Sequence, residues 1–384
     1  MKETVIVGAV RTPIGRKDGS LAGIRADELY ATAINALLER TRVPANLVED
    51  VISGCVTEAG EQGANISRQA GLLSGLPITA AGVTLNRMCG SAQQAIHFGA
   101  QAIAAGDLRY VIAGGVESMS RVPMFSDIQG GFEKLNPKLL SKYSLIHQGE
   151  SAERIAEKYG LTRHTLDEFS MESHRKAAQA TKQGYFSSQL ARIEGRTKDG
   201  QPAKIEYDEG IRSQIDPEKI RKLPTVFRPN GVITAANSSQ ISDGAAALLL
   251  ADRDTAISDG LKPRARFRAR VALGGDPTMQ LLEVIPATRK ALEKAALKLS
   301  DIDVIEINEA FASVVLAWEK ELRPDMHKVN PNGGAIAHGH PLGATGAVLM
   351  TKLLHELERS GKQFGLQVMC IGHGMATATI IERL

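Results

Sequence analysis

The chain has 384 residues, of which 43% are hydrophobic and 23% charged, and its formal net charge is +3 at pH 7. Such a composition is typical of a folded protein of two or three domains and excludes a disordered chain. The small net charge and the lack of long runs of like charge give no indication of nucleic acid as a partner. No uncharged apolar stretch reaches the ~18 residues that a membrane-spanning helix needs, so we expect no membrane span.

The cysteines indicate the compartment. Only three are present, Cys55, Cys89 and Cys370, so they cannot all pair. No apolar secretory segment precedes the first predicted strand at 4–7. We therefore expect reduced thiols in a cytoplasmic protein. Cys55 lies in the mostly apolar run 51–56, which predicts a core residue without a chemical role.

An internal duplication organises the chain. Twice, a helical pattern leads through a turn into a short apolar strand, and a later helix leads into a longer apolar strand. Apolar strands that alternate with helices are typical of mixed or parallel sheets covered on both faces. The sequence therefore predicts an α/β layered sandwich of two similar halves. The matching segments are 29–40 with 51–52 and 287–297 with 304–307, then 90–105 with 110–115 and 346–359 with 365–372.

The segment 121–241 interrupts this duplication. Its content of Lys, Arg, Glu, Gln and Ser rises, and the repeated pattern disappears. Helical spacing over 151–179 predicts a long helix, and 196–200 and 228–231 have the composition of turns. We expect a largely helical insertion that holds the substrate over the layered core.

Cys89 lies in the stretch NRMCGS at 86–91, at the start of a predicted helix. Free N–H groups and the helix dipole favour a thiolate at such a position. The alternative is a buried core cysteine, which is commoner for an isolated cysteine. The polar neighbours Asn86 and Arg87, with Gly90 allowing close backbone approach, favour a nucleophile.

His340 lies in the segment 332–346, which holds five glycines in fifteen residues. Such a loop passes close to a ligand, and Pro341 fixes the turn that holds the imidazole, as a general base requires. A phosphate-binding loop is less favoured, because the segment lacks Gly-Lys-Ser/Thr. A zinc pair of His338 and His340 is also less favoured, since it needs two remote cysteines. We expect no metal.

Cys370 ends an apolar strand and is followed by Gly372, whose N–H could face an anionic oxygen. A thiol is a suitable acid for an enolate formed when a carbon–carbon bond breaks beside a thioester. A core cysteine and a redox partner remain alternatives. His373 is either a proton donor or a space-filling residue between two glycines. Asn308 could hold a water or donate to an oxyanion, or simply cap a helix.

Together with AVRTP at 9–13, GGVESM at 114–119 and SDGAA at 242–246, these stretches resemble the thiolases over essentially the whole chain. The resemblance implies the thiolase-like layered αβαβα sandwich of two duplicated halves, 1–120 with 242–263 and 264–384, with 121–241 as an inserted loop domain. It implies thiolytic cleavage of 3-ketoacyl-CoA by coenzyme A, as in fatty acid β-oxidation, through a cysteine acyl-enzyme with ping-pong kinetics. Coenzyme A would be a co-substrate, without a permanently bound cofactor.

The resemblance also assigns roles. Cys89 would be the acylated nucleophile, His340 its base and Cys370 the acid/base at the acetyl carbon. Asn308 would hold a water that forms one oxyanion hole with His340, and the N–H groups of Cys89 and Gly372 would form the other. Every catalytic position of the pattern is filled.

The loop domain would bind coenzyme A, with Ser239 near the pantetheine arm, Arg212 near the adenine and His147 close to the thioester. Family likeness implies a homodimer or homotetramer. Three positions depart from the usual pattern: Gln148, His338 and His373 stand where methionine, a small residue and glycine are common. All three would lie near the acyl end of the site, which suits a bulky or polar-substituted acyl chain.

Three alternatives stay open. A biosynthetic acetoacetyl-CoA thiolase would condense two acetyl-CoA molecules with the same residues. A decarboxylating ketosynthase shares the fold but uses His or Asn where this chain has Cys370, which disfavours it. An inactive CoA-ester binding protein would not need the intact set of catalytic residues.

Overall fold

The computed structural model describes residues 2–384, in which strands and helices alternate as the sequence predicts. Within this range no helix is both long and apolar enough to cross a membrane. The strands are β1 (Thr4–Arg11), β2 (Gly15–Arg16), β3 (Asp50–Gly54), β4 (Ala81–Leu85), β5 (Tyr110–Ser118), β6 (Gly195–Arg196), β7 (Pro202–Ala203), β8 (Ser242–Asp252), β9 (Ala265–Gly274), β10 (Val304–Ile307), β11 (Phe364–Ile371) and β12 (Met375–Arg383). The helices are α1 (Ala26–Thr41), α2 (Ile66–Leu73), α3 (Ser91–Ala105), α4 (Pro137–Lys142), α5 (Gln148–Lys158), α6 (Arg163–Lys182), α7 (Pro217–Arg221), α8 (Arg253–Ser258), α9 (Val284–Ala295), α10 (Ala312–Leu322), α11 (Ala335–His338) and α12 (Thr345–Ser360).

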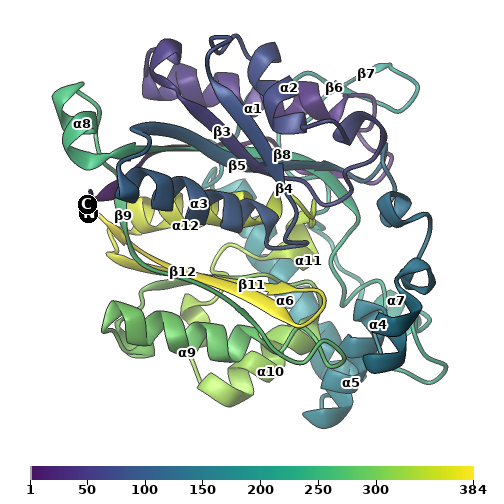
Figure 1. Ribbon diagram of the computed structural model, residues 1–384. Helices are drawn as coiled ribbons and strands as arrows, with labels where there is room; N and C mark the ends of the chain where they lie inside the picture. The colour runs from purple at the N-terminus through teal and green to yellow at the C-terminus, as the bar shows by residue number, and fades with distance from the viewer. Residues whose placement is uncertain (1) are drawn as a thin grey trace.

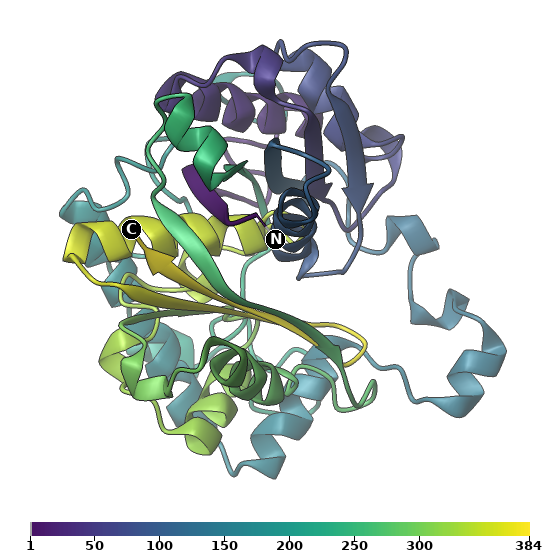
Figure 2. The ribbon, with the colours of Figure 1, turned by 60° about the vertical axis from the view of Figure 1, so that its left-hand side comes forward.

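These elements form alternating layers of helix and sheet (Figures 1 and 2). Helices α1 and α2 cover the outer face of the N-terminal sheet, and α9 and α10 cover the outer face of the C-terminal sheet. Helices α3 and α12 contact each other between the two sheets. The predicted layered α/β sandwich is therefore confirmed.

The strand order shows the duplication directly. The N-terminal sheet contains β3–β5–β8–β1, and the C-terminal sheet contains β10–β11–β12–β9. In both, the first pair is parallel and the next two are antiparallel. Strand β4 extends the first sheet by pairing parallel to β3, and in the second half Val329 makes one parallel bridge to Ile305 of β10. The two halves thus repeat one folding pattern. In the C-terminal half, a single bridge takes the place of the edge strand.

The two sheets are joined where β9 crosses between them. Val5 pairs with Arg266 and Ile6 with Ala265, so the strands form one hydrogen-bonded path. The sequence duplication alone does not predict this link. Strand β8 lies at the centre of its sheet and is buried at every position, which explains its continuous apolar sequence.

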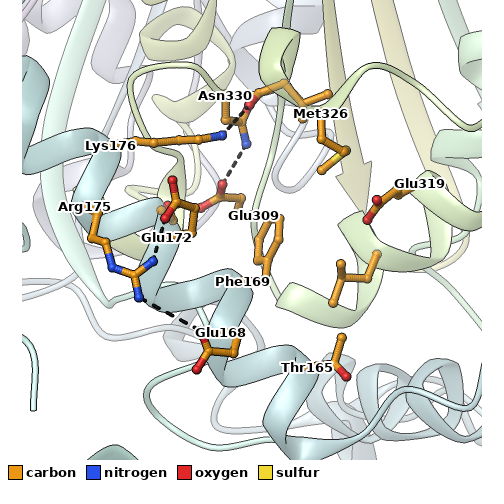
Figure 3. A pocket seen from close by; sticks show the side chains of 13 residues that line it. Thr165, Glu168, Phe169, Glu172, Arg175, Lys176, Glu309, Glu319, Met326 and Asn330 are labelled. Atoms are coloured by element: carbon orange, nitrogen blue, oxygen red, sulfur yellow. Dashed lines mark hydrogen bonds and ion pairs between the residues drawn. The ribbon is translucent and has the colours of Figure 1, made fainter. Parts of the chain in front are cut away.

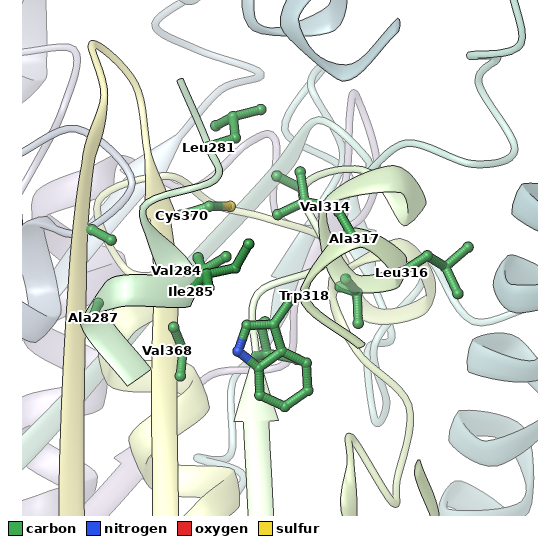
Figure 4. Packing of buried hydrophobic residues seen from close by; sticks show 14 of the residues in the cluster. Leu281, Val284, Ile285, Ala287, Val314, Leu316, Ala317, Trp318, Val368 and Cys370 are labelled. Atoms are coloured by element: carbon green, nitrogen blue, oxygen red, sulfur yellow. The ribbon is translucent and has the colours of Figure 1, made fainter. Parts of the chain in front are cut away.

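The C-terminal half has a core in which Trp318 is the largest side chain (Figure 4). Its indole N–H donates to Thr288 Oγ1 at 3.0 Å and so joins α10 to α9. Cys370, at the end of β11, belongs to the same buried cluster. The reactive end of β11 therefore rests on a rigid, close-packed support.

The insertion is less helical than predicted. Instead of one helix over 151–179, α5 and α6 are separated at Gly160, whose φ is +59°, and Thr162 caps α6 by accepting from Thr165 N–H. The part between β5 and α5 extends away from the layers in Figure 2. Its short helices, Ser126–Ile128, Phe132–Lys134 and α4, contain no buried residue.

Two buried histidines predict a loss of stability in mild acid. Burial lowers the pKa of His97 to about 3 and that of His340 to about 4, whereas an unfolded chain has a histidine pKa of about 6.5. Below about pH 6.5 the unfolded chain therefore binds protons that the folded protein excludes. We expect the free energy of unfolding to fall by about 1.4 kcal/mol per pH unit for each histidine until its folded pKa is reached.

Urea unfolding between about pH 7.5 and 5.5 measures this slope. Replacing His97, which faces Thr379 Oγ1 at 2.7 Å, by glutamine should make the slope shallower. Equal stability of the wild-type protein across this range would contradict the prediction.

Candidate active site

Cys89 lies in a tight turn immediately before α3. Met88 has a left-handed φ of +47°, which is unusual for a residue with a side chain. Its N–H donates to Asn86 Oδ1 at 2.8 Å, and its carbonyl accepts from Ser91 Oγ at 2.6 Å. A Cβ atom on Gly90 would collide with Ile371 Cδ1. Glycine at this position therefore lets the turn pack against the end of β11, beside Cys370.

The thiol of Cys89 keeps its proton near pH 7. Burial, with a smaller contribution from the neighbouring Cys370, raises its pKa to about 12. The thiolate expected from the position before a helix is therefore not favoured, because desolvation outweighs the favourable N–H groups. Reaction at Cys89 needs a group that removes its proton.

His340 has the protonation state that a base requires. Burial lowers its pKa to about 4, so the ring is neutral near pH 7. Its Nδ1 lies 2.6 Å from Thr345 Oγ1, and that hydroxyl donates its proton to Pro341 O at 2.8 Å. The hydroxyl oxygen must therefore accept from Nδ1–H, so Nε2 is the ring nitrogen whose lone pair can take up a proton.

This tautomer makes Thr345 testable. In a Thr345→Val variant the buried Nδ1–H has no acceptor, which costs about 1–3 kcal/mol and favours the wrong tautomer. We expect the rate of the predicted coenzyme A-dependent cleavage of 3-ketoacyl-CoA to fall by roughly 10- to 100-fold. The measurement is the rate at which the 3-ketoacyl-CoA disappears. Thr351→Val is the matched control, because Thr351 lies on the same helix and donates only to Ala347 O. Equal activity of the two variants would refute this role of Thr345.

Asn308 lies between His340 and Cys370. Its Nδ2 is 3.4 Å from His340 Nε2 and 3.7 Å from Cys370 Sγ, and its Oδ1 is buried without a hydrogen-bond partner. Burial raises the pKa of Cys370 to about 11, so this thiol also keeps its proton. The structure therefore brings a base, a proton-carrying thiol and a buried amide together beside the protonated thiol of Cys89.

The turn that follows β11 completes this group. A Cβ atom on Gly372 would come within 2.5 Å of Gln148 Nε2 and 2.8 Å of Met88 Sδ, so a larger residue would displace both side chains. His373 has a left-handed φ of +58°, and its N–H donates to Gln280 Oε1 at 2.7 Å. Its Nε2 is buried without a hydrogen-bond partner, and its ring lies 5.5 Å from that of Phe132.

One cavity of about 710 Å³ joins these residues to the insertion. Cys89, His340, Gln148 and His373 line it, while Cys370, Asn308 and Gly372 lie behind this lining. Its walls are mainly apolar, and most of the large apolar side chains come from the segment between β5 and α5. These side chains are Met119, Met124, Phe125, Ile128, Phe132, Leu135, Phe227 and Phe311. A space of this size and polarity suits a small-molecule ligand.

All three residues predicted to contact coenzyme A line the same cavity. His147 caps α5, because its Nδ1 accepts from Gly149 N–H at 3.1 Å, and its ring stacks on Phe227 at 5.0 Å. Ser239 donates its backbone N–H to Ala310 O at 2.9 Å, which fixes it beside α10. The Arg212 side chain is exposed at the cavity wall.

Buried carboxylates hold the His340 loop from both sides. Glu309 accepts from Ser173 Oγ at 2.7 Å, from Asn330 Nδ2 at 2.8 Å and from Ile336 N–H at 3.2 Å. Figure 3 shows Glu309 pointing toward Asn330, beside a surface groove of about 410 Å³ along α6. On the other side, Glu117 accepts from Gly343 N–H at 2.8 Å.

A role for these carboxylates was not predicted, although Glu117 lies in the motif 114–119 and Glu309 directly follows Asn308. Acidic residues next to buried strands are the signal that could have revealed them, since a buried charge needs several hydrogen-bond donors. Thr345, near the end of the glycine-rich segment, was not predicted either, because a single threonine hydroxyl makes no pattern in the sequence.

The predicted position of His338 near the acyl end is wrong. His338 is buried away from the cavity: its Nε2 donates to Asn332 O at 2.8 Å, and its Nδ1 lies 2.6 Å from Asp208 Oδ2. Asp208 also pairs with Arg11 Nη1 at 2.7 Å. His338 therefore ties the glycine-rich loop to the insertion and to β1. Gln148 and His373 do line the cavity, as predicted.

Cys55 is fully buried, and its thiol faces Glu117. Burial raises its pKa well above the ordinary value, which agrees with the prediction of a core residue. Among residues 2–384, no cluster of three or more His, Cys, Asp and Glu side chains is arranged to hold a metal. His338 and His340 have separate partners.

The sequence and the fold are similar to those of known proteins. Residues 4–254 match the family described as thiolase, N-terminal domain, and residues 261–383 match thiolase, C-terminal domain. The chain is 47% identical over 393 residues to a steroid 3-ketoacyl-CoA thiolase of Mycobacterium tuberculosis, covering 100% of this chain and 95% of that protein. It is 43% identical over 401 residues to a beta-ketoadipyl-CoA thiolase of Escherichia coli, covering 100% of both.

A crystal structure of the Bacillus anthracis acetyl-CoA acetyltransferase is similar, with a TM-score of 0.91 and 38% identity over 100% of this chain and 99% of that one. The chain therefore belongs to the thiolase family, as the sequence motifs predicted. It is an acyltransferase that acts on 3-ketoacyl-CoA esters.

Proposed function

We propose that the chain is a degradative 3-ketoacyl-CoA thiolase that transfers the shortened acyl group to coenzyme A. The observation that carries this proposal is the meeting of Cys89, His340, Asn308 and Cys370 at the inner wall of one cavity. Two buried thiols with a neutral imidazole match the needs of a reaction that makes and breaks a thioester and a carbon–carbon bond.

In the first half-reaction, His340 Nε2 takes the proton of Cys89, and the thiolate attacks the 3-keto carbon. The bond between C2 and C3 breaks, which leaves the acyl group on Cys89 and the enolate of acetyl-CoA. Cys370 gives its proton to C2 of this enolate, and acetyl-CoA leaves. The N–H groups of Cys89 and Gly372 are proposed to stabilise the oxygen that becomes negative at C3.

In the second half-reaction, the Cys370 thiolate accepts the proton of the coenzyme A thiol. The coenzyme A sulfur attacks the acyl carbonyl, and Cys89 leaves and regains its proton from His340. A water held by Asn308 is proposed to form the other oxyanion hole with His340. Each proton returns to its starting group, so the cycle closes and ping-pong kinetics are expected.

The insertion, which we place at 121–241, is proposed to bind coenzyme A as a co-substrate. His147 and Ser239 line the cavity on the approach to Cys89, which suits contacts to the pantetheine arm. The exposed guanidinium of Arg212 lies at the wall of the same cavity, where it could contact the adenine nucleotide. The halves 1–120 with 242–263 and 264–384 would supply the catalytic residues.

The acyl substrate is proposed to be bulky or polar-substituted. Large apolar side chains from the extended part of the insertion line the cavity, while Gln148 and His373 add hydrogen-bonding groups near Cys89. The curated relatives named above include a thiolase for a steroid and one for beta-ketoadipyl-CoA, a bulky and an acidic acyl group.

Initial rates of coenzyme A-dependent cleavage test this substrate class, with acetoacetyl-CoA, longer unbranched 3-ketoacyl-CoAs and a 3-ketoacyl-CoA with a terminal carboxylate. We expect the larger or polar substrates to have the higher kcat/KM. A clear preference for acetoacetyl-CoA would overturn the proposal and favour the biosynthetic alternative. Coenzyme A binding without turnover of any substrate would favour the inactive binding protein.

A homodimer is proposed from the surface around β4. This edge strand exposes Val83, and nearby elements expose Leu72, Leu73, Ile78 and Phe98. Exposed apolar side chains next to an unpaired strand edge favour association with a second copy. A tetramer and the cytoplasmic location remain predictions from the sequence.

A further inference from the structure

Gln148 is the first residue of α5, and its side chain is not used to cap that helix. His147 supplies the cap, because its Nδ1 accepts from Gly149 N–H at 3.1 Å. The Gln148 amide points instead across Gly372, where its Nε2 would lie only 2.5 Å from a Cβ atom at that position. There it lies beside the turn that carries Cys89, since Met88 Sδ would be 2.8 Å from the same Cβ atom and Gln148 and Cys89 line one cavity. The Gln148 amide therefore faces the turn that presents the sulfur atom the reaction uses.

A second glutamine holds this arrangement in place. Gln280 is buried, with 1% of its surface exposed, and it contacts both segments that surround Gln148. Its Oε1 accepts from His373 N–H at 2.7 Å, and its Nε2 donates to Ile146 O at 2.9 Å and to Ser151 Oγ at 3.3 Å. The start of α5 and the turn after β11 are thus tied to one amide, which fixes the backbone of Gln148 relative to the turn that contains Gly372.

The chemistry of an amide defines what Gln148 can do there. Its NH₂ group donates hydrogen bonds, and it neither takes nor gives up a proton near neutral pH. A donor beside a sulfur stabilises the thiolate more than the thiol. Gln148 therefore complements His340: the imidazole removes the proton, and the amide stabilises the charge that remains.

We propose that Gln148 is a further catalytic residue of this chain, whose amide N–H donates to Cys89 Sγ and stabilises the attacking thiolate. The inference rests on the proposed role of Cys89 as nucleophile. It assigns Gln280 as a positioning residue that acts only through Gln148 and the His373 turn. Gln148 would therefore act on Cys89 Sγ in addition to any contact that it makes with the acyl group.

The test measures the alkylation rate of Cys89 by iodoacetamide without substrate, followed by mass spectrometry of the Cys89 peptide between about pH 7 and 9. Gln148→Met keeps the length of the side chain and removes the donor. Its alkylation should be roughly threefold or more slower at each pH, because a tenfold loss of thiolate is partly offset by the greater nucleophilicity of a more basic sulfur. Ile257→Met, at an exposed residue that does not line the cavity, is the control and should react like the wild-type protein.

Gln148→Leu separates the lost hydrogen bond from packing, because leucine also lacks the donor but differs in shape from methionine. A packing role predicts unequal alkylation rates for the two variants, whereas the proposed role predicts that both are slowed by a similar factor. Wild-type rates in both variants would overturn the inference. That result would leave the proposed function intact if thiolysis still requires Cys89, whereas loss of that requirement would overturn the function itself.

Discussion

Replacement of Cys89 by alanine is expected to lower the rate of thiolysis by at least about 10⁴-fold. Both proposed half-reactions pass through the Cys89 thioester, and Cys370 is the acid rather than a second nucleophile in this scheme. The loss should appear in kcat, while binding of coenzyme A should be nearly unchanged, because the cavity wall loses only one sulfur atom.

Cys55→Ala is the control for this experiment. Cys55 is also a fully buried thiol, but it faces Glu117 and does not line the cavity. This variant should keep the turnover of the wild-type protein even if its stability falls. Substantial thiolysis by Cys89→Ala would exclude the proposed covalent route.

The second large effect concerns Cys370. Cys370→Ala should lower cleavage of a 3-ketoacyl-CoA by roughly 10³-fold, within the range for loss of a general acid or base, because the enolate of acetyl-CoA then has no proton donor. Acylation of Cys89 by a saturated acyl-CoA should fall much less, since it forms no enolate and a coenzyme A thiolate is a good leaving group. Single-turnover cleavage and acyl exchange with labelled coenzyme A compare the two steps.

Two outcomes of this comparison are informative. A selective loss of cleavage assigns Cys370 to carbon chemistry. Equal losses in both assays would contradict this assignment and indicate that Cys370 mainly supports the shape of the site, where it belongs to the core cluster shown in Figure 4.

Much of the fold follows from local pattern. The paired segments on either side of the insertion predicted two halves with the same order of helices and strands along the chain, because apolar strands and amphipathic helices have distinct periods. The β1–β9 link and the single bridge at Val329 could not be predicted, since register between distant strands depends on packing. The break between α5 and α6 depends on Gly160 and the cap at Thr162, which the helical spacing did not show.

The candidate site was predictable where glycine marks a close approach. Glycines beside or near Cys89, His340 and Cys370 predict that these residues have chemical roles, and the structure brings all three together. The protonation states were not predictable, because burial decides them: the pKa of Cys89 rises to about 12 although it precedes a helix.

His338 shows the limit of reading neighbours in sequence. It is two residues from His340, yet its ring turns to Asp208 and Asn332 and away from the cavity. Gln280 was not recognised at all, since a single glutamine in a loop has no pattern and gains its importance from contacts with Ile146 and His373.

The most direct test of the central claim is intact-protein and peptide mass spectrometry after mixing the enzyme with a 3-ketoacyl-CoA in the absence of free coenzyme A. The account predicts one shortened acyl group on the peptide that contains Cys89, and its removal when coenzyme A is added. An acyl group on the Cys370 peptide, or turnover without any acylated intermediate, would contradict it.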